Sequence, residues 1–332
     1  MKVTIKDLAR MAGVSTATVS MVLNNKANHI SEKTKEKIWD LAKTHNYVPN
    51  ILARSLVTKK TRTIGLVIPD ITNPFFPEIS RGAEDRANEG GYSVIICNSD
   101  DSPVKEERYV KMLMEKMVDG IIFTDSSSRT PLLLETRSKG VPVVLMGRDV
   151  EVEGPIGRIF VDNIKGAYDA TNHLIERGYK KIALLNGNSG YQTAQERMEG
   201  YRRALQDAGL PYAEQRVLEG TFRQEWGYGG VSWLINQGIE FDAVVCGNDM
   251  VAIGAIKALR FLGKRVPEDV AIIGYDDIYM AKLVDPELTT IAQPSYDLGY
   301  NGCDILIRMI EDGYVQQDPL CYEGQLVVRK ST

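Results

Sequence analysis

From residue 63 onward, short apolar runs alternate with longer amphipathic segments, and this alternation occurs in two series. Apolar runs of about four to eight residues are typical of strands buried on both faces, as in parallel sheets covered by helices. Two such series predict an α/β body of two doubly wound parallel-sheet lobes with a cleft between them. The expected strands are 64–68, 92–97, 120–123 and 141–146 in the first series, and 181–185, 243–246 and 270–273 in the second.

Amphipathic segments separate these runs and predict the helices that cover the two sheets. Asp249 opens one of these helices directly after Asn248, so we expect its carboxylate to have an N-terminal capping role. The expected helices are 80–89 and 106–116 in the first series, 195–208, 225–237 and 249–262 in the second, and 295–312 near the end of the chain.

The distribution of charge sets the first part of the chain apart from the rest. The net charge is −4 overall, but residues 1–62 contain 12 Lys and Arg against 4 Asp and Glu. The remaining residues contain 28 Lys and Arg against 40 Asp and Glu, so a small basic segment precedes a large acidic body. An asymmetry of this kind indicates nucleic-acid binding at the basic end.

The basic segment begins with signals for two short helices. Thr4 is an expected N-cap with Asp7 three residues later, where its carboxylate can reach back to the cap, and Gly13 ends the helix. Ser15 is expected to cap a second helix from residue 16 to about residue 24. A third helix, from the Ser31 N-cap to about residue 45, would close a small core with Ile38, Trp39, Leu41 and Ala42.

The second of these helices has an apolar face formed by Val19, Val22 and Leu23, opposite a face of small side chains. Two helices of this length and spacing indicate a helix-turn-helix, in which the small-residue face enters the major groove of DNA and contacts base edges. The candidate DNA-contacting residues on this face are Thr16, Ala17, Ser20 and Met21.

Five stretches of the basic segment form a recognisable set: Thr4-Ile5-Lys6-Asp7-Leu8-Ala9, Ala12-Gly13-Val14-Ser15-Thr16-Ala17-Thr18-Val19-Ser20, Leu23-Asn24, Tyr47-Val48-Pro49-Asn50 and Ala53-Arg54-Ser55-Leu56. Together they resemble the headpiece of the LacI/GalR family of bacterial repressors, and the resemblance continues through the whole chain. It implies that residues matching 50–57 form a hinge helix on operator DNA, and that the residue matching Leu56 inserts into a minor-groove step. The further DNA-contacting residues that it implies are Tyr47, Asn50, Ala53, Arg54 and Leu56. Met21 departs from the family, which often has Arg or His there, so the operator sequence is not predicted.

The same resemblance implies the domain organisation. We expect a headpiece at 1–48, a hinge helix and linker at 49–62, and a ligand-binding core at 63–332 that resembles the periplasmic sugar-binding proteins. Because the chain crosses between lobes several times in this family, segments 295–312 and 320–328 are expected to return and complete both lobes. The expected lobes are about 63–161 plus 293–320, and about 162–292 plus 321–332.

Polar and aromatic residues follow the expected strands of the body, where open parallel sheets bind their ligands. Aromatic rings can stack on the apolar faces of a sugar ring, while amides, guanidinium groups and a carboxylate bind its hydroxyls. Gly147 departs from ribose-specific relatives of the family, which often have Asp at this position. The candidate ligand-binding residues, which the resemblance also implies, are Asn73, Phe75, Phe76, Arg148, Arg197, Phe222, Asn248, Asp276 and Gln293.

Several classes of function are disfavoured by what the sequence lacks. The start of the chain has no apolar signal-peptide core and no run of eighteen apolar residues occurs, so we expect a cytoplasmic protein without a membrane partner. Cys97, Cys246, Cys303 and Cys321 are expected to be buried thiols, with no metal site. Three histidines without a triad pattern, and the absence of a phosphate-binding glycine loop, indicate a protein that is not an enzyme and needs no cofactor.

These observations predict a transcriptional regulator, most simply a repressor, whose partners are double-stranded operator DNA and a small sugar or sugar phosphate. Two-fold operators require a two-fold protein, so we expect a homodimer. The sequence leaves open whether the sugar weakens operator binding as an inducer or strengthens it as a corepressor. The usual behaviour of the family favours induction. The alternatives are a catabolite-control-type regulator governed by a phosphocarrier protein and, with less support, a solute-binding protein.

Overall fold

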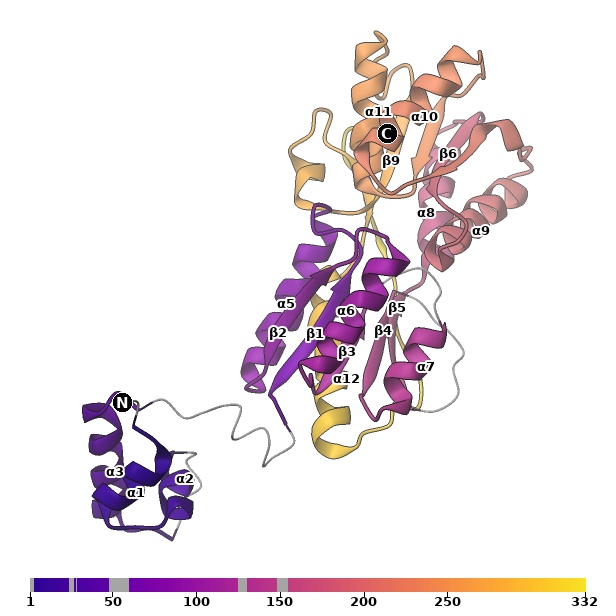
Figure 1. The fold of residues 1–332 in the computed structure, drawn as a ribbon. Helices are drawn as coiled ribbons and strands as arrows, with labels where there is room; N and C mark the ends of the chain where they lie inside the picture. Colours follow the sequence, from indigo (N-terminus) through magenta and orange to yellow (C-terminus); the bar gives the residue numbers. More distant parts are fainter. Residues whose placement is uncertain (1–2, 24–26, 28, 48–59, 125–129, 148–154) are drawn as a thin grey trace. The chain divides into compact units, whose positions relative to one another are not determined.

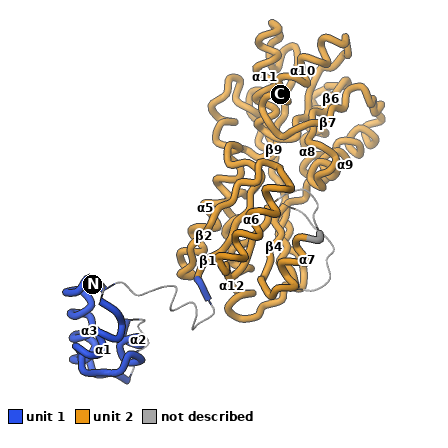
Figure 2. Tube along the Cα trace, viewed as in Figure 1, with its two compact units in different colours: residues 1–61 blue, residues 62–332 orange. Residues whose placement is uncertain are grey.

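The protein is described by a computed structural model over residues 3–23, 27, 29–47, 60–124, 130–147 and 155–332. It consists of two compact units, Met1–Thr61 and Arg62–Thr332, which Figure 2 colours separately. Each unit has its own hydrophobic core, so each is described in turn.

The first unit contains the three predicted helices, α1 (Ile5–Ala12), α2 (Thr16–Leu23) and α3 (Glu32–Thr44). The capping box of α1 is present as predicted: the Thr4 hydroxyl accepts from the Asp7 amide, the Asp7 carboxylate accepts from the Thr4 amide, and Gly13 ends the helix at φ 74°. Ser15 Oγ accepts from the Thr18 amide at 3.1 Å at the start of α2.

The core of the first unit is formed by buried residues from all three helices, including Leu8, Val19 and Ile38. The prediction that Trp39 belongs to this core is wrong, because its side chain is 47% exposed. Ile38 and Ala42 lie four positions apart on the inner face of α3, and the residue after Ile38 is turned about 100° away from that face.

The first lobe of the second unit is a six-stranded sheet with the order β11-β5-β4-β3-β1-β2, all in parallel register. Helices α5 and α12 cover one face, and α6 and α7 cover the other (Figure 1). The strands are β1 (Thr63–Ile68), β2 (Ser93–Asn98), β3 (Gly120–Phe123), β4 (Val143–Met146), β5 (Gly157–Val161) and β11 (Leu320–Tyr322), and the helices are α5 (Phe75–Glu89), α6 (Pro103–Glu115), α7 (Thr130–Ser138) and α12 (Ser295–Asp312).

The second lobe is a sheet of the same size with the order β12-β10-β9-β8-β6-β7. Helices α8 and α9 cover one face, and α10 and α11 cover the other. The strands are β6 (Ile182–Gly187), β7 (Val217–Gly220), β8 (Ala243–Cys246), β9 (Ala271–Asp276), β10 (Thr289–Ala292) and β12 (Gln325–Val327); the helices are α8 (Asn163–Glu176), α9 (Gln192–Asp207), α10 (Gln224–Asn236) and α11 (Asp249–Phe261), with single 3₁₀ turns η1 (Glu214–Arg216) and η2 (Tyr279–Lys282).

The predicted fold class, a helical headpiece with two doubly wound lobes, is confirmed, with one exception in the sheets. β12 runs antiparallel to β10. It follows β11 after a two-residue connection, so segment 320–328 supplies one short edge strand to each lobe. The chain passes between the lobes three times, after β5, after β10 and after β11.

The structure bears on two expectations from the sequence, the burial of the cysteines and the lack of a membrane-spanning helix. Cys97, Cys246 and Cys303 are buried free thiols, but Cys321 is exposed, because it lies on the edge strand β11. The prediction of burial is therefore wrong for Cys321. Among the described residues, no helix is both long and apolar enough to cross a membrane.

Candidate functional site

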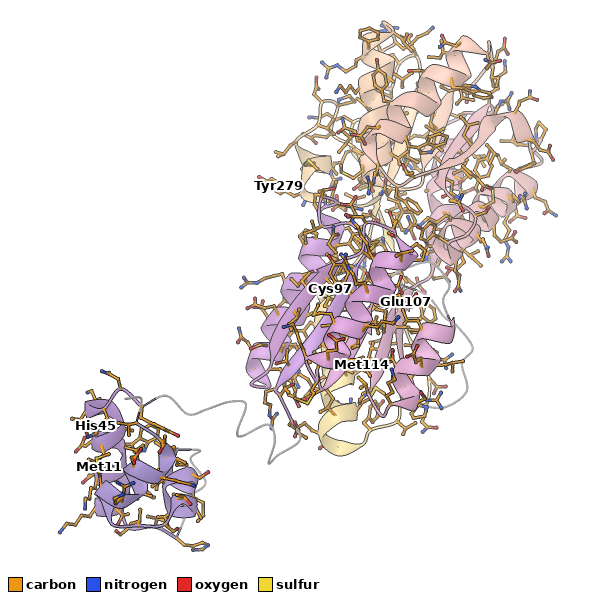
Figure 3. All side chains as sticks on the ribbon, in the orientation of Figure 1. Met11, His45, Cys97, Glu107, Met114 and Tyr279 are labelled. Atoms are coloured by element: carbon orange, nitrogen blue, oxygen red, sulfur yellow. The ribbon has the colours of Figure 1, made fainter. Side chains whose placement is uncertain are left out.

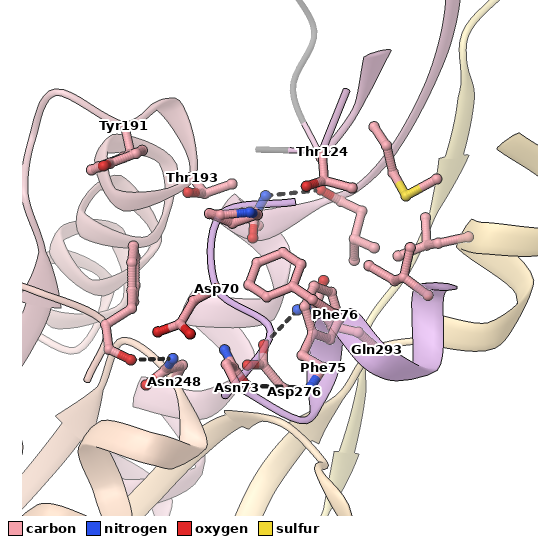
Figure 4. Close-up of a pocket in the computed structure, with 18 of the residues that line it drawn as sticks. Asp70, Asn73, Phe75, Phe76, Thr124, Tyr191, Thr193, Asn248, Asp276 and Gln293 are labelled. Carbon is pink, nitrogen blue, oxygen red and sulfur yellow. Dashed lines mark hydrogen bonds between the residues drawn. The ribbon is translucent and has the colours of Figure 1, made fainter. Parts of the chain in front are cut away.

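A pocket lies between the two lobes of the second unit, at the carboxyl ends of their strands (Figure 4). Its position agrees with the rule that open parallel sheets bind ligands at these ends. Arg148, which was also predicted to bind the ligand, lies outside the described residues. The remaining predicted ligand residues all line the pocket: Asn73, Phe75, Phe76, Arg197, Phe222, Asn248, Asp276 and Gln293.

Aromatic side chains form two walls of the pocket, one in each lobe. Phe75 and Phe76, in the first turn of α5, pack edge to face with their ring centroids 5.3 Å apart. Phe222 of the second lobe packs against Tyr191, with ring centroids 6.3 Å apart. A planar or ring-shaped ligand with apolar faces can therefore contact aromatic surface from both lobes.

Asp276 ends β9 and is the most perturbed carboxylate of the pocket. Its backbone has φ 118°, a strained value for a residue other than glycine, and its side chain is buried. Gln293 Nε2 donates to its Oδ1 at 2.6 Å. Burial raises the pKa of Asp276 to about 7, although the charge of Arg197 and the Gln293 hydrogen bond both act to lower it.

Arg197 projects from α9 and is buried at the base of the pocket. Its Nε donates to Asn163 Oδ1 at 3.0 Å, and its Nη1 donates to the carbonyl oxygen of Gly247. The guanidinium carbon lies 3.8 Å from the centroid of the Tyr275 ring, which stacks beneath it. The guanidinium carbon also lies 5.8 Å from the centroid of the Phe222 ring, so the arginine is fixed in place by two acceptors and two aromatic rings.

Two of the asparagines that line the pocket, Asn248 and Asn73, also make hydrogen bonds within the chain. Asn248 Oδ1 accepts from the Val251 amide at 2.9 Å and caps α11, while its Nδ2 donates to the Phe222 carbonyl at 3.0 Å. Asn73 Oδ1 accepts from the Phe75 amide at 3.2 Å. Both residues therefore shape the pocket as well as line it.

The predicted capping role of Asp249 is wrong, because Asn248 is the N-cap of α11. Asp249 is instead completely buried and joins three segments: its Oδ1 accepts from Thr290 Oγ1 at 2.6 Å and its Oδ2 accepts from the Ile278 amide at 2.9 Å. Its burial, together with the nearby charge of Asp276, raises its pKa well above the usual range.

The sequence analysis missed several residues that line the pocket, among them Asp70, Asp101, Thr124, Tyr191 and Arg223. Arg223 Nε lies 3.5 Å from Asp70 Oδ2, and this ion pair crosses from the second lobe to the first. A signal was available for two of them: Thr124 directly follows β3, and Asp70 follows β1 by two positions, so the strand-end rule applies to both.

In the first unit, the predicted DNA-contacting residues of α2 lie opposite its buried face. Thr16, Ala17 and Met21 are exposed and Ser20 is half-buried, whereas Val19 and Val22 are buried. Tyr47 is half-buried against the small core, and this burial raises the pKa of its hydroxyl. The other predicted contacts, Asn50, Ala53, Arg54 and Leu56, lie outside the described residues.

Comparison with known proteins identifies both units. Residues 4–50 match the family described as "Bacterial regulatory proteins, lacI family", and residues 61–321 match "Periplasmic binding proteins and sugar binding domain of LacI family". The chain is 40% identical over 333 residues to the HTH-type transcriptional regulator RegA of Clostridium saccharobutylicum, covering 100% of both chains.

Among the solved structures that resemble the whole chain, two are described here by what they bind. One is a lac repressor dimer bound to operator and the anti-inducer ONPF, with a TM-score of 0.88, 30% identity, and coverage of 100% of this chain and 99% of that one. The other is a complex of the transcriptional regulator CelR with cellobiose, with a TM-score of 0.76, 32% identity, and coverage of 99% of this chain and 100% of that one.

Proposed function

Because the chain belongs to the LacI family and is a DNA-binding transcriptional regulator rather than an enzyme, we propose that a small sugar or sugar derivative in the pocket controls its affinity for operator DNA. The observation that carries this proposal is the pocket itself, in which aromatic walls from both lobes enclose a fixed arginine and a buried carboxylate. A lining of aromatic side chains with a few placed polar groups is typical of small-molecule sites.

The pocket suits the two kinds of surface that a sugar presents. Aromatic rings such as Phe75 and Phe222 suit the apolar faces of a pyranose or furanose ring. Asp276 and Gln293 suit its hydroxyl groups, which act as donors and acceptors. The chemistry of this lining therefore favours a polyhydroxylated ring over a purely apolar ligand.

Control of DNA binding follows from the position of the pocket between two lobes. A ligand that contacts both lobes stabilises the closed arrangement, in which the lobes are close together. The size of this effect is set by the difference between the ligand's affinities for the closed and the open arrangement. If closure of the lobes alters how well the headpieces fit DNA, the sugar changes operator affinity, and operator DNA changes sugar affinity by the same factor.

On the DNA side, we assign base contacts to Thr16, Ala17, Ser20 and Met21 on the exposed face of α2. The chemistry of Tyr47, Asn50, Ala53, Arg54 and Leu56 suits contacts with the backbone and the minor groove. A helix-turn-helix protein binds a two-fold operator as a dimer, and the similar lac repressor is a dimer on its operator.

A homodimer is also supported by apolar side chains on the surface of the second unit. Ile96 on β2 is exposed, and so are Phe261, Tyr279 and Leu283 of the second lobe; Tyr279, labelled in Figure 3, is 71% exposed. If these residues lie at the interface of a dimer, pairing removes their apolar surface from water, which favours association. We infer that these surfaces pair two copies of the chain.

The proposal is tested by screening pentoses, hexoses and disaccharides in two assays. The first is a thermal shift, because a ligand at a hundredfold above its Kd adds about 2.7 kcal/mol to the free energy of unfolding. The second is fluorescence anisotropy with a duplex selected from genomic fragments by the protein itself. We expect at least one sugar to raise the melting temperature and to change the Kd for the duplex. A sugar that does neither is not the effector, and failure of every sugar would contradict the proposal.

A further inference from the structure

The four helices of the second lobe begin in two different ways. Asp162 caps α8 and Asn248 caps α11, and each side chain accepts a hydrogen bond from a backbone amide of its own helix. Tyr191 is the N-cap residue of α9 and Arg223 that of α10, and in the described part of the chain neither side chain caps its helix. Helices prefer neither residue at this position, and a positive charge there opposes the helix dipole. Departures of this kind from local preference are expected at functional sites.

The side chains of Tyr191 and Arg223 reach the first lobe instead. Arg223 Nε lies 3.5 Å from Asp70 Oδ2, and Asp101 accepts a hydrogen bond from the Tyr191 hydroxyl. Asp70 follows β1 and Asp101 follows β2, which is the neighbouring strand of the same sheet. All four residues line the pocket. Two polar contacts therefore join the lobes at the pocket itself.

The first lobe holds its two carboxylates in position. Asp70 Oδ1 accepts from the amide and the hydroxyl of Thr72, at 2.9 and 2.6 Å, which leaves Oδ2 for the ion pair. Asp100 and Asp101 have φ values of 52° and 56°, a conformation that is uncommon for residues other than glycine. The Asp101 amide donates to the Pro69 carbonyl oxygen at 3.2 Å, so the two loops are tied together. Backbone in such conformations clusters at binding sites and switch regions.

The strength of these contacts suits parts that separate and rejoin. The side chains of Arg223 and Asp70 are 48% and 14% exposed. Partly exposed ion pairs contribute little to stability, and salt weakens them. A weak contact between two lobes that move can still shift the balance between their arrangements, because it exists in only one of them.

We propose that Arg223, Asp70, Tyr191 and Asp101 form a latch that favours the closed arrangement of the lobes when no ligand is bound. The latch sets the fraction of ligand-free protein that is closed. The apparent affinity for any ligand that binds the closed lobes varies with this fraction. Because the latch acts in the ligand-free protein, the proposal does not depend on the identity of the effector.

The test measures the distance between the lobes in the full-length protein without added ligand. Nitroxide labels are attached at Lys111→Cys on α6 and Arg203→Cys on α9, two positions with exposed side chains. The background carries Cys321→Ser, which removes an exposed native thiol. Labelled protein is mixed with an excess of unlabelled protein, so that each distance is measured within one chain. Double electron–electron resonance then gives the populations of closed and open lobes.

We expect Arg223→Gln to raise the ratio of open to closed lobes about two- to fivefold, the range expected for one partly exposed ion pair. Tyr191→Phe, which removes only the hydroxyl, should change the ratio in the same direction. Arg223→Lys keeps the charge and should retain most of the closed population. Raising the salt concentration from about 0.1 M to about 1 M shortens the Debye length from about 10 Å to about 3 Å. It should open the wild type but have little effect on Arg223→Gln.

The matched control is Arg265→Gln, which removes an arginine ion pair that lies wholly within the second lobe, with Asp269. This variant should leave the ratio of open to closed lobes unchanged.

Three results would overturn the latch. The first is a distance distribution that is the same in the wild type, Arg223→Gln and Tyr191→Phe. The second is an equal shift in Arg265→Gln, because the loss of any ion pair would then open the lobes. The third is a wild type whose ratio of open to closed lobes does not respond to salt. Each of these results leaves sugar control of operator binding intact, since that proposal is tested by its own ligand screen.

Discussion

At the scale of single residues, two buried carboxylates dominate the electrostatics of the second lobe. Asp276 faces the pocket and Asp249 lies behind it, and the charge of Asp276 raises the pKa of Asp249 further. Both are held by hydrogen bonds rather than by a direct ion pair: Gln293 donates to Asp276, and Thr290 donates to Asp249. A buried carboxylate with a raised pKa ties the stability of the fold to pH.

The sign of this dependence can be tested with Asp276→Asn. The pKa of Asp276 rises from 3.8 to about 7 on folding, so the folded chain binds more protons than the unfolded chain between these values. Its contribution to stability is therefore fully present below pH 3.8 and is lost as the pH rises through 7. The wild type loses this contribution as the pH rises from 5 to 8, whereas the variant has no such group to titrate. We therefore expect the difference in free energy of unfolding, variant minus wild type, to increase between pH 5 and pH 8. Urea denaturation at both pH values measures this, and a difference independent of pH would show that Asp276 titrates normally.

Arg197→Lys tests the fixed arginine of the pocket. Lysine keeps the charge but lacks the planar group that bonds Asn163 and stacks on Tyr275, so we expect the effector response to be lost. Operator binding without effector should stay within about twofold, because the headpiece has its own core. Arg203→Lys, at an exposed position of the same helix, is the matched control and should retain the response. A retained response in Arg197→Lys would show that the pocket residues are wrongly assigned.

Residue by residue, the sequence predicted the part of the pocket that strand ends determine. Phe222, Asp276 and Gln293 could be found because the carboxyl ends of parallel strands meet at one edge. Tyr191 and Arg223 were missed, because each lies in a loop a few positions beyond a strand end, where the sequence does not show which side chains turn toward the pocket. Asn248 shows another limit of prediction from sequence, because an asparagine that caps a helix and one that binds a ligand look alike in sequence.

At the scale of elements, pairs of helices pack through glycines. A Cβ on Gly82 of α5 would lie 2.1 Å from the Tyr296 carbonyl oxygen of α12, and one on Gly299 of α12 would lie 1.9 Å from the Ile79 carbonyl oxygen of α5. Gly227 of α10 and Gly254 of α11 form a similar contact in the second lobe. Without side chains at these points, the helix backbones touch.

We expect Gly82→Ala to lower the free energy of unfolding by about 1–3 kcal/mol, because α5 and α12 must move apart to admit the methyl group. The control is Gly229→Ala on α10, where nothing lies within 4 Å of the new Cβ. That substitution should stabilise the protein by up to about 1 kcal/mol through helix propensity. Chemical denaturation of both variants is the measurement, and equal effects would mean that the close approach of α5 and α12 carries no energetic cost.

Among the elements, the sequence analysis missed both helices and strands, and it gave no bounds for α7 and α8. The sequence analysis gave no bounds for β5, β7 and β10, since runs of four or five residues with mixed polarity lack a clear period. Helix α5 begins at Phe75 rather than at residue 80, because Pro77 lies in its first turn, where a missing amide hydrogen is tolerated. Such short strands are defined by their pairing with neighbouring strands in the folded sheet, and not by a pattern in their own sequence.

At the scale of the whole molecule, the boundary in charge matches a boundary in structure. The basic segment forms a unit with its own core, and the acidic body forms another that contains the pocket. The LacI family membership that the headpiece motifs predicted is confirmed by both family matches. Effector specificity was not predictable from sequence, because it depends on which pocket side chains pair with one another after folding.

The headpiece and the linker that follows it are expected to contact DNA in different ways, and this gives a prediction. Replacing Thr16 with Ala should change the preference among operator bases, since its side chain is exposed on α2. Replacing Lys59 with Ala should weaken binding to all duplexes and reduce the slope of log Kd against log salt by about 1, as expected for one lost phosphate contact. Anisotropy titrations on operator and random duplexes at several salt concentrations measure both effects. Similar behaviour of the two variants would contradict the assignment of base contacts.

The central claim, that sugar occupancy and operator binding are coupled, is tested most directly by a closed thermodynamic cycle on one protein sample. The Kd for operator is measured with and without saturating sugar, and the Kd for sugar is measured with and without saturating operator. The account predicts that both ratios differ from one and equal each other, because coupling between two sites is reciprocal. An operator Kd that is unchanged by a sugar shown to occupy the pocket would contradict it.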